Sequence, residues 1–331
     1  MTDDAVLSVL DDLVGKARAA GADAADAVAV RGDSLSVAWR RGALEHVERS
    51  EGEDIGLRVL VGQRQAAASS ADRSPTALAA LVERVVAMAK AAPKDPTAGL
   101  ADPSQLARDW PDLDLYDASE PSVEALQTLV GEAEEAMLAV PGVSTNSEGA
   151  EAGWGRAALA VAASNGFAAQ YQRTGTSLHA VALAGEGTGM ERQYDAHRAV
   201  HMADLEPAAL IGRRAGERAV KALGARKPKS QAVPLIFDRR IAGGMLMTLA
   251  NAINGQAIAR GTSFLKDAMG EAVFAPGVRV IDDPRRIRGL ASAPFDGEGL
   301  PAEPLTLIED GVLQHWLLNL ANARQLGLES N

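Results

Sequence analysis

The sequence predicts an α+β protein with two antiparallel meander sheets, each flanked by helices, followed by the start of a β-rich C-terminal domain. Short runs of alternating apolar and polar residues, separated by glycine-containing turns, occur in both halves and are typical of antiparallel strands. Longer segments with apolar residues at helical spacing lie on both sides of each set of strands. Because the order helix, sheet, helix occurs twice, the sequence suggests a structural duplication, although no repeat of fixed period is visible.

The first half begins with a predicted helix and continues as a meander. Apolar residues recur at helical spacing from Val6 to Ala17 behind a Thr2/Asp3 cap, and Gly21 ends the pattern. Glycine-containing dipeptides then divide an alternating segment into short strands. The five predicted strands are Ala25–Arg31, Ser34–Arg40, Ala43–Arg49, Ile55–Val61 and Arg64–Ser70.

Two helices complete a predicted first domain over residues 1–140. The helix over Thr76–Ala91 follows Pro75, a residue favoured in the first helical turn. The helix over Ser122–Ala139 stops at Pro141. Between them, Pro93–Pro121 is rich in Pro and Asp, so we expect this connection to lie on the surface.

A central antiparallel sheet plus a helix is predicted over residues 141–226. The predicted strands are Ser144–Glu148, Arg156–Ser164, Phe167–Thr174, Ser177–Gly185 and Gly189–Val200. Asn165-Gly166 between two of them is the strongest hairpin signal in the chain. A helix over Pro207–Leu223 follows, and Gly224 ends it.

The last third, residues 227–331, is predicted to start the C-terminal domain. Its predicted elements are a strand (Ala232–Phe237), an apolar helix (Ile241–Ile253), a polar loop (Asn254–Ser263) and two strands (Leu305–Ile308 and Val312–Leu317). Glu309-Asp310-Gly311 joins the last two strands as a hairpin turn. No terminating helix is predicted before Asn331, so we expect this domain to be truncated.

Composition excludes several classes of function. The formal net charge is −11, with 33 Lys and Arg against 44 Asp and Glu, which argues against nucleic acid as a partner because phosphate binding needs clustered cations. The chain has no cysteine and therefore no disulfide, thiolate nucleophile or cysteine-based zinc site. No signal peptide and no apolar run of about 18 residues is visible. We therefore expect a cytoplasmic protein without a membrane partner.

The residue types used in metal and acid–base catalysis form no convincing constellation. His197 and His201 have a spacing that suits a metal on a helix, but their segment is predicted as a strand, where the two side chains lie roughly 13 Å apart. Adjacent carboxylates such as Asp282 and Asp283 face opposite sides of a strand. The glycines of Gly185–Gly189 are typical of a hairpin turn and not of a phosphate-binding loop, and Gly-x-Ser-x-Gly does not occur. We predict no catalytic or metal-binding residue in this chain.

The most unusual polar segment follows the apolar helix of the last third. It contains Asn251, Asn254, Arg260, Gly261, Thr262 and Ser263. One interpretation is that these residues cap a helix and form a turn. The other is that they offer backbone and amide hydrogen bonds to an extended peptide, which makes them the predicted peptide-binding residues.

Several short motifs occur in a characteristic order along the chain. They are residues 237–244 (FDRRIAGG), 260–264 (RGTSF), 277–284, 294–299 (PFDGEG) and 307–313 (LIEDGVL), with residues 48–59 in the first half. In these motifs the sequence resembles the TldD/PmbA family, and more specifically its PmbA (TldE) branch, which has been described as a modulator of DNA gyrase. The resemblance extends over essentially the whole chain. It implies a cytoplasmic two-subunit metalloprotease that degrades unfolded or short peptides.

The resemblance also implies which subunit this is. In the TldD branch, zinc is held by a His-Glu-x-x-x-His helix and a cysteine. Here the corresponding helix has Leu246, Met247 and Asn251 about where that motif falls, and it contains neither His nor Glu. We therefore expect no cofactor in this chain, a TldD-like zinc subunit as its heterodimer partner, unfolded peptides as substrates, and a homodimer when the chain is isolated. The alternatives are a regulatory binding protein acting on gyrase without proteolysis, and an autonomous hydrolase.

Overall fold

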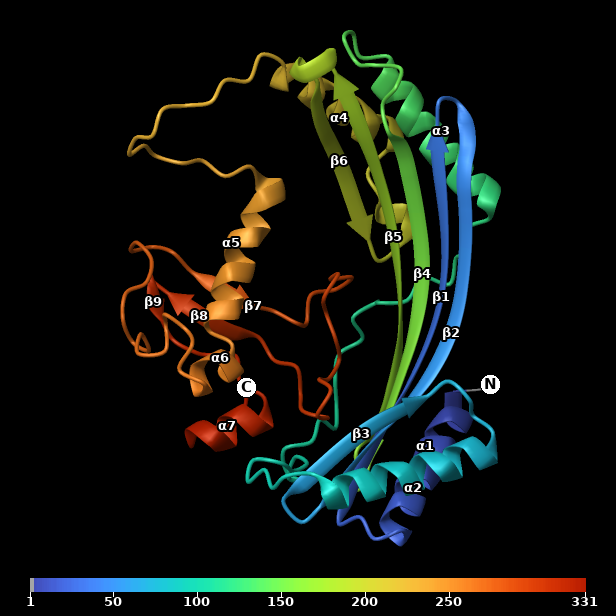
Figure 1. Cartoon of the computed structure of the whole chain (residues 1–331), viewed down its shortest axis with the longest axis vertical. Coiled ribbons are helices and arrows are strands. Elements are labelled where there is room, and N and C mark those ends of the chain that lie inside the picture. Colours follow the sequence, from blue (N-terminus) through green and yellow to red (C-terminus); the bar gives the residue numbers. More distant parts are fainter. Residues whose placement is uncertain (1–2) are drawn as a thin grey trace.

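The computed structural model describes the backbone of residues 3–331 and the side chains of residues 5–331, so the predicted cap at Thr2/Asp3 lies outside the described side chains. Its main element is one six-stranded antiparallel sheet in the order β3-β2-β1-β4-β5-β6 (Figure 1). The strands are β1 (Ala24–Arg40), β2 (Ala43–Val61), β3 (Arg64–Ser70), β4 (Gly149–Ala163), β5 (Ala168–Ala184) and β6 (Glu191–Ala199). The predicted α+β class, with antiparallel sheet flanked by helices, is confirmed.

The two predicted meanders are the two halves of this single sheet. Strand β1 pairs with β4 from Asp26↔Ala163 to Trp39↔Ala150, which joins them edge to edge. Pairing the two inner edges satisfies backbone groups that separate meanders would leave open.

Several short predicted strands are also continuous. Gly32 lies opposite Gly52 inside the β1–β2 ladder, and Gly175 lies inside β5, so these glycines do not form turns. A glycine can remain in a ladder because its backbone groups pair as those of any other residue do. Residues 144–148 form a turn and not the predicted strand.

Four helices cover the two ends of one face of the sheet. Helices α1 (Asp3–Ala19) and α2 (Pro75–Ala91) cover one end, and α3 (Val123–Leu138) and α4 (Ala208–Ala222) cover the other (Figure 1). On β1, Ala27 and Ala29 pack under the first pair, and Leu35 and Val37 pack under the second. All four residues are odd-numbered, so both helix pairs lie on the same face, here called the helix face.

Close packing of α4 on α3 depends on glycine. A Cβ placed on Gly212 would lie 1.8 Å from the carbonyl oxygen of Ala133 on α3. The two helix backbones therefore approach each other more closely than any side chain at this position allows.

The C-terminal region, residues 227–331, forms a smaller unit beside the sheet. Its elements are α5 (Arg239–Ala252), α6 (Gly255–Ala259), β7 (Val280–Asp282), β8 (Leu305–Glu309), β9 (Val312–Leu313) and α7 (Leu320–Leu326). Strands β7, β8 and β9 form a three-stranded sheet that packs against Leu249 and Ile253 of α5.

Three features of this region differ from the sequence prediction. Residues 232–237 form no strand, and α6 occupies part of the predicted polar loop. Helix α7 was not expected, although Asn319 caps its first turn and Gly327 ends it at φ +68°. Its seven residues are too few to show a clear apolar period, which explains why the pattern missed it.

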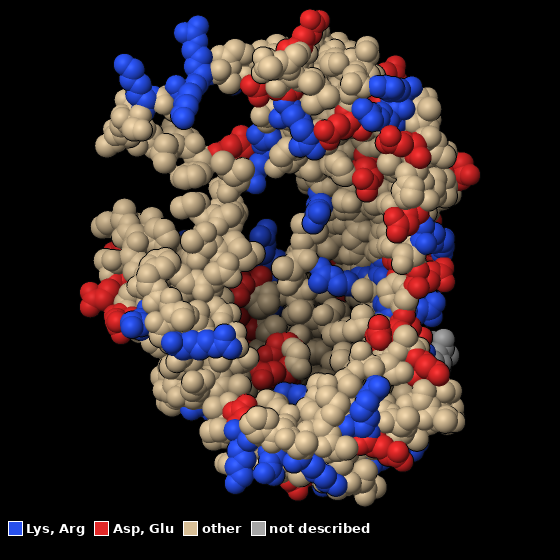
Figure 2. Space-filling model, viewed as in Figure 1, with Lys and Arg blue, Asp and Glu red and all other residues tan. Residues whose placement is uncertain are grey.

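Aromatic packing fixes the C-terminal region on the second face of the sheet, here called the open face. Phe295 contacts Phe167 of the β4–β5 hairpin loop, Tyr171 of β5 and Trp110 of the connection, with ring centroids 5.2, 5.4 and 5.0 Å apart. The connection was expected on the surface, but part of it is buried in this cluster. In the space-filling view a hollow lies between the C-terminal region and the open face, with charged side chains of both signs around it (Figure 2).

None of the helices in the described part of the chain is both long and apolar enough to cross a bilayer.

Candidate peptide-binding site

The open face carries a groove along the middle of strands β1, β4, β5 and β6. Its volume is about 530 Å³. The floor consists largely of small residues, including Ser34, Ser36, Gly153, Gly155 and Ser177. Such residues let another chain approach the sheet closely, because no large side chain stands above the backbone. We call this the open-face groove.

Arginine supplies the charge of the open-face groove. Arg156, Arg173 and Arg198 line it, and none of its lining residues, all of which lie in the described part of the chain, is Asp or Glu. Arg156 lies opposite Asp33 in the register and so places its side chain on the helix face, which leaves Arg173 and Arg198 to supply guanidinium groups to the groove. Arg173 donates a hydrogen bond to the carbonyl oxygen of Leu290, whereas Arg198 is exposed and has no ion pair with any described side chain. In a chain with a net charge of −11, this groove is a local positive surface.

Two of the predicted peptide-binding residues line a second groove at the junction of the C-terminal region and the sheet. Asn254 and Arg260 face a space of about 610 Å³ between α6, α7, β3 and the loop 95–97. Amide side chains dominate its lining: Gln65, Asn254, Gln256, Asn319, Asn322 and Gln325. An amide both donates and accepts hydrogen bonds, so this amide groove matches the alternating N–H and C=O groups of a peptide backbone.

Three of the other four predicted residues, Gly261, Thr262 and Ser263, lie in the turn that follows α6. Gly261 has φ +70° and ends the helix. The Thr262 hydroxyl donates to the carbonyl oxygen of Ala257 at 3.2 Å. Ser263 is buried, and its hydroxyl donates to the carbonyl oxygen of Ala252 and accepts from the backbone N–H of Leu265. Asn251 is exposed at the end of α5 and does not line the amide groove. Asn254 also has a structural role, because its side-chain oxygen caps α6 by accepting a hydrogen bond from the backbone N–H of Gln256 at 3.0 Å. The capping interpretation therefore holds for Asn254, and Arg260 lines the amide groove beside it.

Helix α5 corresponds to the helix that, by the resemblance, carries the zinc motif in the TldD branch. In this chain the helix presents apolar side chains at those positions. Leu246 and Met247 are 55% and 61% exposed. Across the described residues, no three His, Asp or Glu side chains come close enough together to hold a metal ion. His197 and His201 have separate roles. Nδ1 of His197 accepts a hydrogen bond from the backbone N–H of Glu206, and Nε2 of His201 lies 3.2 Å from Asp114.

A carboxylate pair that the sequence reasoning missed lies where the C-terminal region meets the sheet. The Asp296 carboxylate accepts hydrogen bonds from the backbone N–H groups of Glu298 and Leu300, and that of Glu298 accepts one from Leu320. Burial raises the pKa of both carboxyls above their ordinary values. The sequence does show these two carboxylates close together, in the Phe-Asp-Gly-Glu-Gly segment. Alternating carboxylates in a glycine-rich loop are also typical of exposed turns, so the segment alone does not predict that they are buried.

Comparisons with known proteins cover nearly the whole chain. Residues 25–89 match domain 1 of the PmbA/TldA metallopeptidases, residues 116–223 match the central domain, and residues 230–331 match the C-terminal domain. The metalloprotease PmbA of Escherichia coli O157:H7 is 34% identical over 99% of this chain and 72% of its own length. A PmbA homologue of Haemophilus influenzae is 32% identical over 94% of this chain and 69% of its own length.

Solved structures share the fold at lower sequence identity. A protein of Bacteroides thetaiotaomicron described as a proposed modulator of DNA gyrase superposes with a TM-score of 0.93 at 24% identity, covering 100% of this chain and 76% of its own. TldE of Thermococcus kodakarensis superposes with a TM-score of 0.84 at 19% identity, covering 97% and 72%. With the family domains matched in order and 34% identity to PmbA, this chain belongs to the PmbA/TldD metallopeptidase family.

Proposed function

We propose that this chain is the subunit without zinc of a TldD/PmbA-type peptidase, and that it binds unfolded or short peptides while a zinc-containing partner subunit hydrolyses them. The observation that carries the proposal is the composition of α5. Zinc in proteins is held by Cys, His, Asp or Glu side chains. Helix α5, with the sequence RRIAGGMLMTLANA, contains none of these.

The two grooves support the peptide-binding part of the proposal. The open-face groove offers a floor of small residues and two guanidinium groups, and the amide groove offers paired donors and acceptors. An extended peptide exposes backbone N–H and C=O groups that a folded protein keeps in its own secondary structure. The hollow between the sheet and the C-terminal region therefore favours unfolded chains (Figure 2).

The exposed apolar side chains of α5 support the proposal that this chain binds a partner subunit. Ile241, Met245, Leu246 and Met247 are each at least half exposed on this helix. Several exposed large apolar side chains on one short helix mark a protein–protein contact more often than a free surface. The zinc subunit covers them in the complex, and a second copy of this chain covers them when the partner is absent. The complex is cytoplasmic.

Reconstitution tests the assignment. The purified chain, a TldD-type zinc subunit and their mixture are each incubated with an unfolded peptide, with and without a chelator, and the zinc content of each sample is measured. Only the mixture should cleave the peptide, and the chelator should abolish cleavage. Zinc-dependent cleavage by this chain alone would refute the proposal, and chelator-insensitive cleavage would favour an autonomous hydrolase. Tight binding to gyrase that is independent of the zinc subunit would favour the regulatory alternative.

The interface has its own test. Met247→Asp places a charge on the exposed surface of α5 and should weaken association with the zinc subunit at least tenfold. Leu44→Asp is a matched control, because Leu44 is similarly exposed but lies on β2. Equal affinity of both variants would exclude α5 from the interface.

A further inference from the structure

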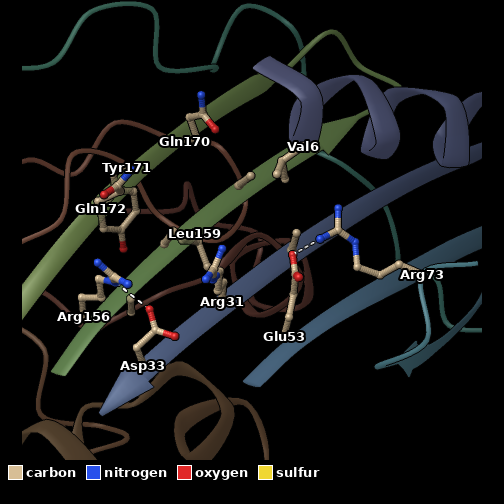
Figure 3. A pocket seen from close by; sticks show the side chains of 14 residues that line it. Val6, Arg31, Asp33, Glu53, Arg73, Arg156, Leu159, Gln170, Tyr171 and Gln172 are labelled. Carbon is tan, nitrogen blue, oxygen red and sulfur yellow. Dashed lines mark hydrogen bonds and ion pairs between the residues drawn. The ribbon is translucent and has the colours of Figure 1, made fainter. Parts of the chain in front are cut away.

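A charged pocket lies on the helix face of the sheet, in the gap between the two helix pairs. Strand β1 has 17 residues and spans roughly 55 Å, whereas α1, also 17 residues long, spans about 25 Å. Each helix pair therefore covers only one end of the long strands. The uncovered middle forms a pocket of about 390 Å³, here called the central pocket (Figure 3).

Strand register alternates charge across the floor of the central pocket. Arg31 of β1 lies opposite Glu53 of β2, and Asp33 of β1 lies opposite Arg156 of β4. These positions continue the same face of β1 that is apolar under both helix pairs. A stretch of charge in the middle of an otherwise apolar strand face requires either solvent or a polar ligand above it.

Two ion pairs use both carboxylates of the pocket. Arg156 donates to Asp33 at 2.6 Å, and the Asp33 side chain is only 4% exposed. Arg73, which precedes α2, forms an ion pair with Glu53. Figure 3 shows both pairs, with Arg31 between them. Although Glu53 lies directly opposite Arg31 in the register, its carboxylate is directed to Arg73.

Arg31 differs from the other two guanidinium groups of the pocket. Of the described residues that line the pocket, Arg73 pairs with Glu53 and Arg156 pairs with Asp33, and Arg156 also lies 3.6 Å from Glu120. Arg31 has no ion pair with any side chain in the described range 5–331. A planar guanidinium matches the two oxygens of a carboxylate in a bidentate geometry.

The remaining lining of the central pocket combines small apolar residues with the amide side chains of Gln170 and Gln172 on β5. Val6 of α1, Ala29 of β1 and Ala160 of β4 line it beside the charged floor. We propose that the central pocket binds a small carboxylic acid with a compact apolar body, such as a free apolar amino acid or the C-terminal residue of a short peptide, with Arg31 as the residue that binds the carboxylate. This site lies on the face of the sheet opposite the open-face groove and does not depend on the proposed function.

Titration calorimetry with defined small probes tests the proposal. N-acetyl-leucine carries the carboxylate and an apolar body, N-acetyl-leucinamide has the same body without the charge, and inorganic phosphate has the charge without the body. N-acetyl-leucine should bind saturably with a dissociation constant of about 1 mM or lower, and the amide should not bind. Added salt should weaken binding, because Arg31 is exposed to solvent.

Variants of Arg31 assign the binding to this pocket. Arg31→Gln should raise the dissociation constant about tenfold or more, and Arg31→Lys should raise it less because it retains the charge without the bidentate geometry. Arg18→Gln is the control, since Arg18 is also exposed but lies in the last turn of α1, outside the pocket. Thermal unfolding of each variant checks that it is folded.

Four results would overturn the proposal. They are the absence of saturation on the order of 10 mM N-acetyl-leucine, equal binding of the amide, equal binding of phosphate, and unchanged affinity in a folded Arg31→Gln variant.

Discussion

Phe295 packs edge-on against Phe167, with ring centroids 5.2 Å apart and ring planes inclined at 74°. The two residues are 128 positions apart in the chain and connect the C-terminal region to the strand hairpin of the sheet. Phe295 is 2% exposed, and the close approach of Gly299 to the Phe167 ring leaves no room for another side chain at that position. Aromatic contact of this kind adds to the free energy gained from burial alone.

Replacing Phe295 should loosen the C-terminal region. Phe295→Ala leaves a cavity between three aromatic rings, and we expect a loss of about 3–5 kcal/mol in the free energy of unfolding. Urea unfolding measures the loss, and hydrogen exchange should show increased exchange in residues 227–331. Phe264→Ala is the control, because Phe264 is 78% exposed and should change stability by less than about 0.5 kcal/mol. Equal losses in both variants would contradict this account of the contact.

Gly212 should not tolerate a methyl group. Gly212→Ala forces α4 away from α3, because the added Cβ collides with a backbone carbonyl that cannot rotate away, and we expect destabilisation by about 1–3 kcal/mol. Gly15→Ala in α1 provides the contrast, since nothing lies within 4 Å of its added Cβ. That change should stabilise the protein by roughly 0.5–1 kcal/mol. Thermal unfolding of both variants checks the opposite signs.

The carboxyl of Asp296 should make the fold less stable as pH rises. Burial raises the pKa of Asp296 in the folded protein above its ordinary value of 3.8, so the folded state binds more protons than the unfolded state between these two pKa values. The free energy of unfolding contributed by this group therefore falls as pH rises through that window. Glu298 acts in the same direction above its ordinary value of 4.5.

Asp296→Asn removes the titration while its side-chain oxygen still accepts the hydrogen bonds from Glu298 and Leu300. The stability of this variant should depend less on pH than that of the original protein. Measuring urea unfolding of both proteins across acidic pH gives the difference directly. An identical pH dependence would show that the carboxyl does not titrate differently in the folded state.

The predicted peptide-binding residues should separate into two groups. Arg260→Ala removes a cation from the amide groove and should weaken binding of a labelled unfolded peptide by about threefold to tenfold with little effect on stability. Ser263→Ala removes a buried hydroxyl that holds the turn and should cost about 1 kcal/mol of stability. Fluorescence anisotropy reports the binding and urea unfolding reports the stability. Loss of peptide binding in Ser263→Ala but not in Arg260→Ala would contradict this division.

Local signals predicted much of the secondary structure. Asn165-Gly166 joins β4 to β5, with Gly166 at φ +95°, as expected of a hairpin. Asp310 and Gly311, both with positive φ, connect β8 to β9. Ser74 caps α2, which begins at Pro75. These features could be predicted because turn and cap energetics depend on a few adjacent residues.

The sequence by itself also determined the composition of α5, which contains no side chain suited to zinc, and the alternation that marks the strands. Tertiary structure alone decided that β1 pairs with β4 and that Gln65 and Asn254 line the same groove. It also decided that Glu53 pairs with Arg73 and leaves Arg31 without an ion pair in the described range. Such contacts either join residues far apart in the chain or select one partner among several. The periodicity of a sequence reports only which face of its own helix or strand a side chain occupies. It therefore carries no information about the partner that the side chain meets.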